Sequence, residues 1–225
     1  MVIRDSEWRG ASGAEIGADV AASMAAGEAV VLFSELRMTP NPGAFLKEVG
    51  RVICAGETEV VKLSKGVPSS LHTERPYDAD PPLICGFVNL GKKDTYITLG
   101  YDSLVAMLAE DNPRLLKELK VPMAFVSDDQ LQQTTAPVID PVTRNLRFQR
   151  RYATGERRPW ATTFREWLDE KKRQQPPGLE QFALGKSSAF FARNGHVLIG
   201  RRHSGSDGQV HQLNVPAPTR SGETE

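Results

Sequence analysis

Three consecutive residues, His72, Thr73 and Glu74, carry the side chains best suited to chemistry in this chain. They lie in a loop-like stretch, residues 68–76, just before the apolar run Leu83–Leu90. On extended backbone, side chains two residues apart point the same way, so the imidazole and the carboxylate can reach one metal ion. With a second, distant histidine they would form the two-histidine, one-carboxylate set that holds non-heme Fe(II). Without that partner, the same tripeptide also fits a surface histidine beside a solvated glutamate.

Length and composition limit the classes of protein to consider. The 225 residues suit one domain with a sizeable core, which we expect to span residues 1–215, with a disordered tail over residues 216–225. Lys plus Arg and Asp plus Glu balance at 28 each, so charge gives no argument for a nucleic-acid or membrane partner. No apolar run is long enough to span a bilayer, and the N-terminus lacks the apolar core of a signal peptide. The two cysteines, Cys54 and Cys85, are each expected to be reduced and buried in the core rather than joined in a disulfide. We therefore expect a cytoplasmic protein with a small-molecule partner, and the sequence leaves its oligomeric state open.

The order of the expected elements predicts an α+β protein. Capping patterns and helical spacing predict helices at residues 13–26, 42–53, 103–110, 114–119 and 160–172. Short apolar segments predict strands at residues 29–33, 59–63, 83–90, 94–99, 123–126, 145–152, 186–201 and 209–215. This order contains no internal repeat and no β-α-β alternation, which favours an antiparallel sandwich or jelly roll over a doubly wound sheet. Phosphate-loop, CxxC and G-x-S-x-G motifs are absent from the sequence, which removes several common enzyme classes.

Several motifs in the same order resemble the taurine dioxygenase/clavaminate synthase superfamily of Fe(II)- and 2-oxoglutarate-dependent oxygenases. After the His-x-Glu pair come Pro81-Pro82 and an apolar strand, then the strand at residues 94–98 and a helix pair within residues 101–119. The strand at 29–33 and the helix that follows it are also similar to the family's first strand and helix. The resemblance covers residues 28–215 and implies a double-stranded β-helix, or jelly roll, with flanking helices.

The resemblance also implies a cofactor, a cosubstrate and a substrate class. Fe(II) would be held by His72 and Glu74, and 2-oxoglutarate and O2 would oxidise a small, amino-acid-derived metabolite. Thr98, or less favourably Thr95, would contact the cosubstrate. Outside the family context, Thr98 is equally well explained as a β-former on a strand.

The C-terminal part departs from the family pattern at three positions. The family has an Asn, four residues, and then the distal His followed by Gly-Arg, and residues 194–201 reproduce this frame with Ile199 in the His position. The arginines that would bind the cosubstrate carboxylates align with Val210 and Asn214. An isoleucine cannot ligate a metal, and neither valine nor asparagine can form the two charge-assisted hydrogen bonds that an arginine gives a carboxylate. Binding of 2-oxoglutarate is therefore left open.

Other residues could supply the missing groups. His196 and His203 are weak candidates for the third metal ligand: strand parity puts His196 on the opposite face unless Gly195 forms a bulge, and His203 lies about 13 Å along the strand. His211 has the wrong parity on the next strand. Arg150 and Arg151 lie where the family places substrate contacts, and either could clamp a carboxylate or phosphate. Arg157 and Arg158 fit a solvated surface.

Two functions remain. In the first, the chain is an iron-dependent oxygenase with an atypical metal and cosubstrate site. In the second, it has lost iron and 2-oxoglutarate and binds a small molecule, or performs acid-base chemistry with His72 and Glu74. The intact His-x-Glu pair favours the first function, whereas Ile199, Val210 and Asn214 favour the second.

Overall fold

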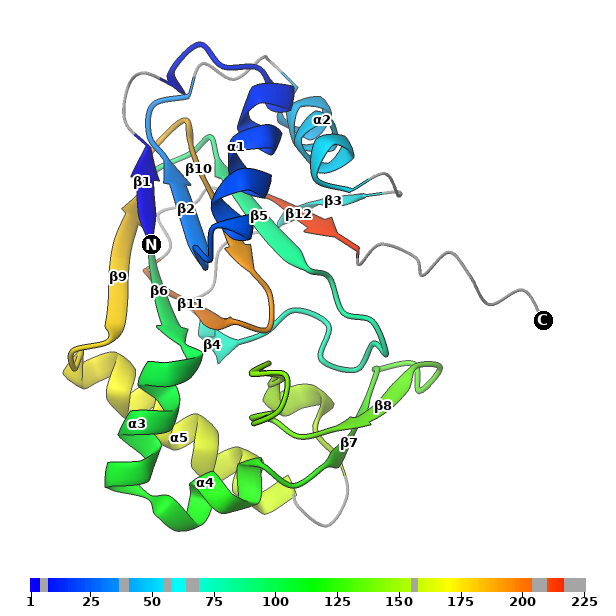
Figure 1. Ribbon diagram of the computed structural model, residues 1–225, viewed down its shortest axis with the longest axis vertical. Helices are drawn as coiled ribbons and strands as arrows, with labels where there is room; N and C mark the ends of the chain where they lie inside the picture. Colours follow the sequence, from blue (N-terminus) through cyan, green and yellow to red (C-terminus); the bar gives the residue numbers. More distant parts are fainter. Residues whose placement is uncertain are drawn as a thin grey trace.

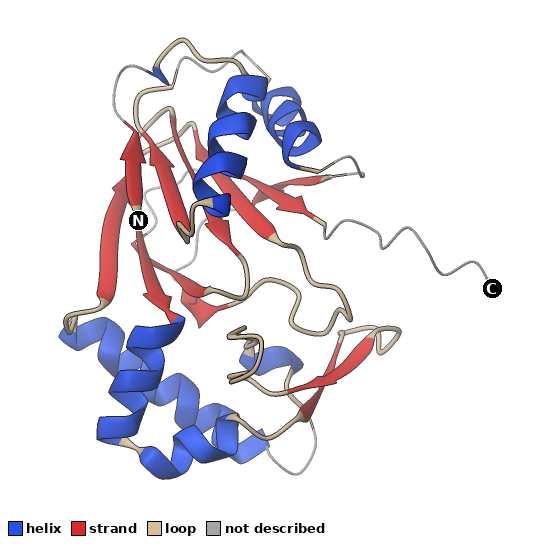
Figure 2. Cartoon of the chain, in the orientation of Figure 1, coloured by secondary structure: helices blue, strands red, loops and turns tan. Residues whose placement is uncertain are grey.

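A computed structural model describes residues 1–4, 8–36, 41–54, 58–63, 69–154, 158–203 and 210–216, without the side chains of residues 62, 63, 158, 202 and 203. In these residues the helices form two groups, with the strands between them (Figure 1). Helices and mainly antiparallel strands are segregated rather than alternating, as the secondary-structure colouring shows (Figure 2). The expectation of an α+β protein is therefore confirmed. No helix in the described ranges is long and apolar enough to cross a membrane.

The larger sheet has six strands in the order β1-β2-β10-β5-β12-β3. All its pairs are antiparallel except the parallel pair of β1 and β2. Its strands are β1 (Val2–Arg4), β2 (Val30–Phe33), β10 (Ser188–Arg193), β5 (Ile84–Asn89), β12 (Val210–Val215) and β3 (Glu59–Leu63). Because β10, β5 and β12 lie side by side, segments more than 100 residues apart in the sequence share one surface.

A smaller antiparallel sheet and a separate hairpin complete the strands. The smaller sheet has the order β4-β11-β6-β9, with β4 (Ser69–His72), β11 (Val197–His203), β6 (Asp94–Gly100) and β9 (Leu179–Leu184). The hairpin pairs β7 (Met123–Val126) with β8 (Gln133–Ala136). It projects beside the lower helices in Figure 1.

Two helices, α1 (Gly13–Ala25) and α2 (Pro42–Ile53), cover the outer face of the larger sheet. Ser12 and Glu15 form the expected capping box at the start of α1, and Asn41 caps α2 through the amide of Ala44. The apolar side chains of both helices join those of the sheet in one buried cluster, which includes Ile16, Val20, Phe45, Leu46, Phe33, Phe191 and Leu213.

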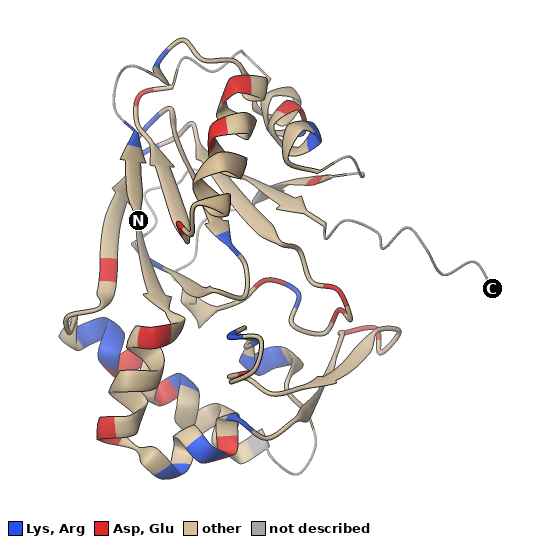
Figure 3. Ribbon diagram, in the orientation of Figure 1, with Lys and Arg blue, Asp and Glu red and all other residues tan. Residues whose placement is uncertain are grey.

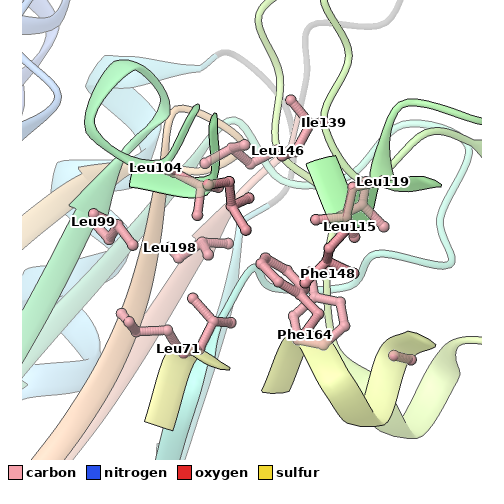
Figure 4. Packing of buried hydrophobic residues seen from close by; sticks show 14 of the residues in the cluster. Leu71, Leu99, Leu104, Leu115, Leu119, Ile139, Leu146, Phe148, Phe164 and Leu198 are labelled. Atoms are coloured by element: carbon pink, nitrogen blue, oxygen red, sulfur yellow. The ribbon is translucent and has the colours of Figure 1, made fainter. Parts of the chain in front are cut away.

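Three further helices cover the outer face of the smaller sheet: α3 (Tyr101–Asp111), α4 (Pro113–Leu119) and α5 (Arg158–Gln174). Leu71, Leu99 and Leu198 extend from this sheet towards the aromatic rings of Phe148 and Phe164 (Figure 4). The ring centroids of Phe148 and Phe164 are 4.7 Å apart in an edge-to-face arrangement. This cluster fixes the smaller sheet, which carries His72, against the helices.

A third buried cluster lies between the two sheets. It contains Phe87 and Phe190 from the larger sheet and Tyr96, Phe182 and Ile199 from the smaller one. Strand alternation therefore divides each sheet into a face covered by helices and an inner face that meets the other sheet. Charged residues of both signs lie mainly on helices and loops in the ribbon of Figure 3, in keeping with the balanced composition.

Several expectations about individual elements were wrong. Residues 145–152 do not form a strand; the segment ends in a short 3-10 helix, Arg150–Tyr152. Residues 186–201 are two strands, because Gly195, with φ of 83°, and His196 form a turn that takes the chain from β10 in the larger sheet to β11 in the smaller sheet. Strands β1, β4, β8 and β9 were not expected, and Val52, expected on the inner face of α2, is 44% exposed. The predicted tail lies outside the described residues, apart from Pro216.

Candidate functional site

A β-bulge in β4 positions His72. Ile199 of β11 lies across from His72 and Arg201 lies across from Ser69, so β4 advances three residues while β11 advances two. Strand alternation places Leu71 in the core covered by helices, while His72 shares the inner face with its partner Ile199. The Nζ of Lys172, from α5, donates to the carbonyl oxygens of Ser69 at 2.7 Å and Arg201 at 2.8 Å, which holds the irregular pairing together.

Two distant segments hold the main chain on either side of Glu74. The amide of Thr73 donates to the carbonyl of Phe148 at 2.8 Å, and the Phe148 amide donates to the Thr73 hydroxyl at 2.9 Å. Asn194, which is 8% exposed, accepts from the Glu74 amide at 3.0 Å and donates to the carbonyls of Glu74 and Pro82 at 3.1 and 2.8 Å. The asparagine of the C-terminal frame thus fixes the residue that carries the carboxylate.

Replacing Asn194 with alanine is expected to destabilise the protein by about 3 kcal/mol, because it leaves buried backbone groups of Glu74 and Pro82 without partners. Urea denaturation measures the loss. The exposed Asn145, in a neighbouring loop, provides the matched control, since Asn145→Ala should change stability by less than about 0.5 kcal/mol. Equal stability of the two variants would contradict the clamping role of Asn194.

The His72 and Glu74 side chains meet on the inner face. The Nε2 of His72 lies 3.4 Å from Oε1 of Glu74, and Nδ1 is 2.8 Å from the Ser70 carbonyl oxygen. Burial lowers the pKa of His72, but the hydrogen bond and charge of Glu74 outweigh it and leave that pKa raised. Burial raises the pKa of Glu74, and the interactions with His72 and Gln212 outweigh it and leave that pKa lowered. Both directions favour an imidazolium-carboxylate pair.

Amide side chains of β12 connect Glu74 to the protein surface. Gln212 donates a hydrogen bond to the Glu74 carboxylate, and its Nε2 also donates to Oδ1 of Asn214 at 3.0 Å. Asn214 then donates to Oε2 of Glu59 at 3.0 Å, and Glu59 pairs with Arg75 at 2.6 Å. Asn214, which aligns with an arginine that binds the cosubstrate in the family pattern, here belongs to this series of hydrogen-bonded side chains.

A row of three residues crosses the inner face of the smaller sheet. Ile199 pairs with His72 on one side and with Thr98 on the other. Ile199 is 5% exposed and Thr98 is buried. Neighbouring strands lie about 4.8 Å apart, so Ile199 is the nearest cross-strand neighbour of His72 and brings no donor atom. On the facing sheet, the inner face of β12 is occupied by every second residue, namely Val210, Gln212 and Asn214.

His72 and Glu74 fit two positions around a divalent metal ion. Two cis ligands, each about 2.1 Å from an octahedral ion, lie about 3 Å apart, close to the 3.4 Å between Nε2 and Oε1. A third protein donor is missing: over the described ranges, no group of three or more His, Cys, Asp and Glu residues could hold a metal ion. Water or a bound small molecule can complete the coordination of such a site.

The other sequence candidates lie in different places. His196 sits in the turn between β10 and β11, where its carbonyl accepts from the Tyr101 amide, and it lines a separate pocket. The side chain of His203 is outside the described part, although its backbone pairs with Thr95. His211 is on β12, one residue out of phase with the inward Gln212 and Asn214.

The two arginines predicted to bind substrate lie on the 3-10 helix, and both are exposed. Arg151 pairs with Asp128 and its guanidinium lies 4.9 Å from the centroid of the Tyr152 ring. Of the other arginines considered, Arg157 and the side chain of Arg158 fall outside the described residues. A role for Arg150 or Arg151 in substrate binding stays a prediction.

Sequence reasoning missed the contributions of Gln212 and Lys172. The alternation of β12 contained a signal for Gln212, because it is two residues from both Val210 and Asn214 and must share their face. No local pattern marks Lys172, whose partners are carbonyl oxygens on two strands far away in the sequence.

Comparison with solved structures identifies the fold. The chain superposes on asparagine oxygenase, in complex with Fe(II), 3-hydroxyasparagine and succinate, with a TM-score of 0.63, 14% identity, and coverage of 90% of this chain and 79% of that one. It matches PvcB from Pseudomonas aeruginosa with a TM-score of 0.60, 15% identity and coverage of 95% and 84%. The corresponding values for the non-heme iron oxygenase OrfP with Fe and alpha-ketoglutaric acid are 0.59, 10%, 90% and 79%. No family model and no curated protein matches the sequence. The fold is therefore that of the non-heme iron oxygenases, at a large sequence distance.

Proposed function

We propose that this protein is a non-heme Fe(II) oxygenase that acts on a small, amino-acid-derived metabolite. The observation that carries the proposal is the pairing of His72 Nε2 with Glu74 Oε1 at 3.4 Å on the inner face of a fold shared with such enzymes. Structures with this fold include complexes with a hydroxylated asparagine and with a dihydroxylated arginine. These ligands support amino acids as the substrate class.

The arrangement of the sheets supports the finer fold assignment. The strand orders β1-β2-β10-β5-β12-β3 and β4-β11-β6-β9, with an apolar interior between them, suit a double-stranded β-helix. We propose that residues 1–215 form this single domain, with its helices outside the two sheets.

The residues of the site take separate roles in this proposal. His72 and Glu74 hold the metal, which, when bound, supplies the activation of O2. Asn194 and Gln212 orient Glu74, one through its backbone and the other through its carboxylate. Ile199 closes one side of the site with an apolar surface, so the remaining coordination positions are left to water or to the small-molecule ligands. Thr98 is proposed to contact 2-oxoglutarate, since it lies in the same cross-sheet row.

Anaerobic titration of the metal-free protein with Fe(II) and 2-oxoglutarate tests the proposal. We expect stoichiometric metal binding and, once 2-oxoglutarate is added, the weak visible charge-transfer band of a chelated iron complex. Metal binding without the band would limit the proposal to an iron site that does not use this cosubstrate. Absence of the band together with substoichiometric metal would reject it in favour of a protein that binds a small molecule without iron.

A further inference from the structure

A pocket of about 420 Å³ is lined by Glu74 and by Asn194, the residue that hydrogen-bonds the Glu74 backbone. It is formed by three segments: the loop after Thr73, the turn before Phe148, and the turn between β10 and β11. Its volume suits a small metabolite. Its polar lining includes Arg193, Arg147, His196 and Asp80.

Arg193 is a half-buried cation without an acidic partner. Among the residues that the structure describes, no carboxylate forms an ion pair with its guanidinium, and no side-chain hydrogen bond of Arg193 is found. The buried Arg201 differs because it pairs with Asp94 at 3.7 Å and donates to the Tyr96 hydroxyl at 2.8 Å. A partly buried guanidinium that lines a pocket, and whose N–H donors have no side-chain partner, suits a carboxylate ligand because it can donate two parallel hydrogen bonds to it.

The rest of the pocket wall adds positive potential. Nη1 of Arg147 donates to the carbonyl oxygens of Pro76 at 3.0 Å and Asp78 at 2.5 Å, so this arginine shapes the wall while it keeps its charge. Burial, followed by the charges of Arg193 and Arg144, lowers the pKa of His196, which leaves the imidazole neutral at physiological pH. The cationic side of the pocket therefore comes from the two arginines, and His196 offers hydrogen bonds without charge.

A carboxylate also lines the pocket. Asp80 is exposed, and its charge acts on the nearby Arg147, whereas the Glu74 carboxylate is already engaged by His72 and Gln212. The Arg193 guanidinium, which has no ion-pair partner among the described residues, and the exposed Asp80 carboxylate together complement a zwitterion. We infer that the pocket binds an α-amino acid, with Arg193 holding the α-carboxylate and Asp80 attracting the ammonium group.

The inference deepens the proposed function and rests on it, because it assigns the substrate's polar end to this pocket. Arg193 and Asn194 are consecutive, and Asn194 bonds both backbone groups of Glu74. The end of β10 that would bind the carboxylate is therefore next to the residue that positions a metal ligand. A substrate anchored at Arg193 would thus be held against the segment that carries the metal site.

Binding of amino acids to the metal-free protein tests this assignment without any turnover. Each common L-amino acid is screened by thermal shift, and the strongest binder is titrated by calorimetry beside its decarboxylated amine. We expect the amino acid to bind and the amine to bind at least about 10-fold more weakly. Arg193→Gln should weaken amino-acid binding by about 10- to 100-fold. Arg193→Lys should weaken it less, since lysine keeps the positive charge and loses only the paired N–H donors of the guanidinium.

Arg114→Gln is the matched control, because Arg114 is 90% exposed on α4, outside the pocket, and should leave binding unchanged. The assignment is overturned if no amino acid binds, if the amine binds as tightly as the amino acid, or if Arg193→Gln retains wild-type affinity. Failure of the proposed iron site would show separately, as absent Fe(II) binding in a protein that still binds the amino acid.

Discussion

Replacing Ile199 with histidine is expected to raise the affinity for Fe(II) by at least about 100-fold, since changes to groups that merely support metal ligands already alter affinity by about 10- to 100-fold. Ile199 lies directly across from His72 and faces the same interior. Side chains in such cross-strand pairs have Cβ atoms about 5 Å apart, which lets two imidazoles reach one metal ion. The substitution would complete a facial set of two histidines and one carboxylate. Anaerobic titration in competition with a chelator measures the change.

Ile199→Val is the matched control for this gain. It keeps the site apolar, adds no donor, and should cost only about 1 kcal/mol of stability because it removes one buried methylene. Its Fe(II) affinity should equal that of the wild-type protein. If Ile199→His folds and binds Fe(II) no more tightly than Ile199→Val, the three side chains do not converge on one metal position.

Replacing His72 with alanine is expected to abolish measurable Fe(II) binding. The wild-type site has two protein donors, and the variant keeps only the carboxylate of Glu74. The variant should remain folded, because His72 is not part of the buried apolar clusters and Glu74 keeps its hydrogen bond from Gln212. Equilibrium dialysis against Fe(II), with circular dichroism to verify folding, measures both expectations.

His211→Asn provides the comparison for His72→Ala. His211 is a half-buried histidine on β12, out of phase with the residues that face the interior, so its replacement should leave Fe(II) binding intact. Loss of binding in both variants would show that His211 takes part in the site. Retention of binding in both would place the metal away from His72.

Local sequence signals predicted much of the fold. The capping box at Ser12 and Glu15 and the capping asparagines Asn41 and Asn112 correctly located the starts of α1, α2 and α4, because helix ends depend on hydrogen bonds within a few residues. Strands with continuous apolar runs, such as β5, were also located. Polar or short strands such as β4 and β8 were missed, since their pairing partners supply the pattern that their own residues lack.

The segment around Phe148 illustrates how distant contacts override local pattern. Its alternation of apolar and charged residues predicted a strand, yet its backbone hydrogen bonds go to separate segments rather than to one neighbouring strand. Arg147 donates to the Val138 carbonyl, Leu146 donates to the Gly195 carbonyl, and Phe148 exchanges hydrogen bonds with Thr73. The following Arg150 and Arg151 turn into a 3-10 helix on the surface. The arginines that line a pocket are instead Arg147 and Arg193, and Arg193 ends a strand in which it is the only charged residue.

The sequence by itself determined the chemical identity of the His72 and Glu74 pair and its common direction, because residues two apart on extended backbone share a face. The resemblance to the oxygenase superfamily aligned Ile199 with the position of that family's distal histidine. Only the tertiary structure decided what surrounds the pair: Asn194 at the backbone of Glu74, Gln212 at its carboxylate, and Ile199 beside His72. These partners lie more than 100 residues along the chain, and sheet register and a β-bulge, neither of which is encoded within a local window, bring them together.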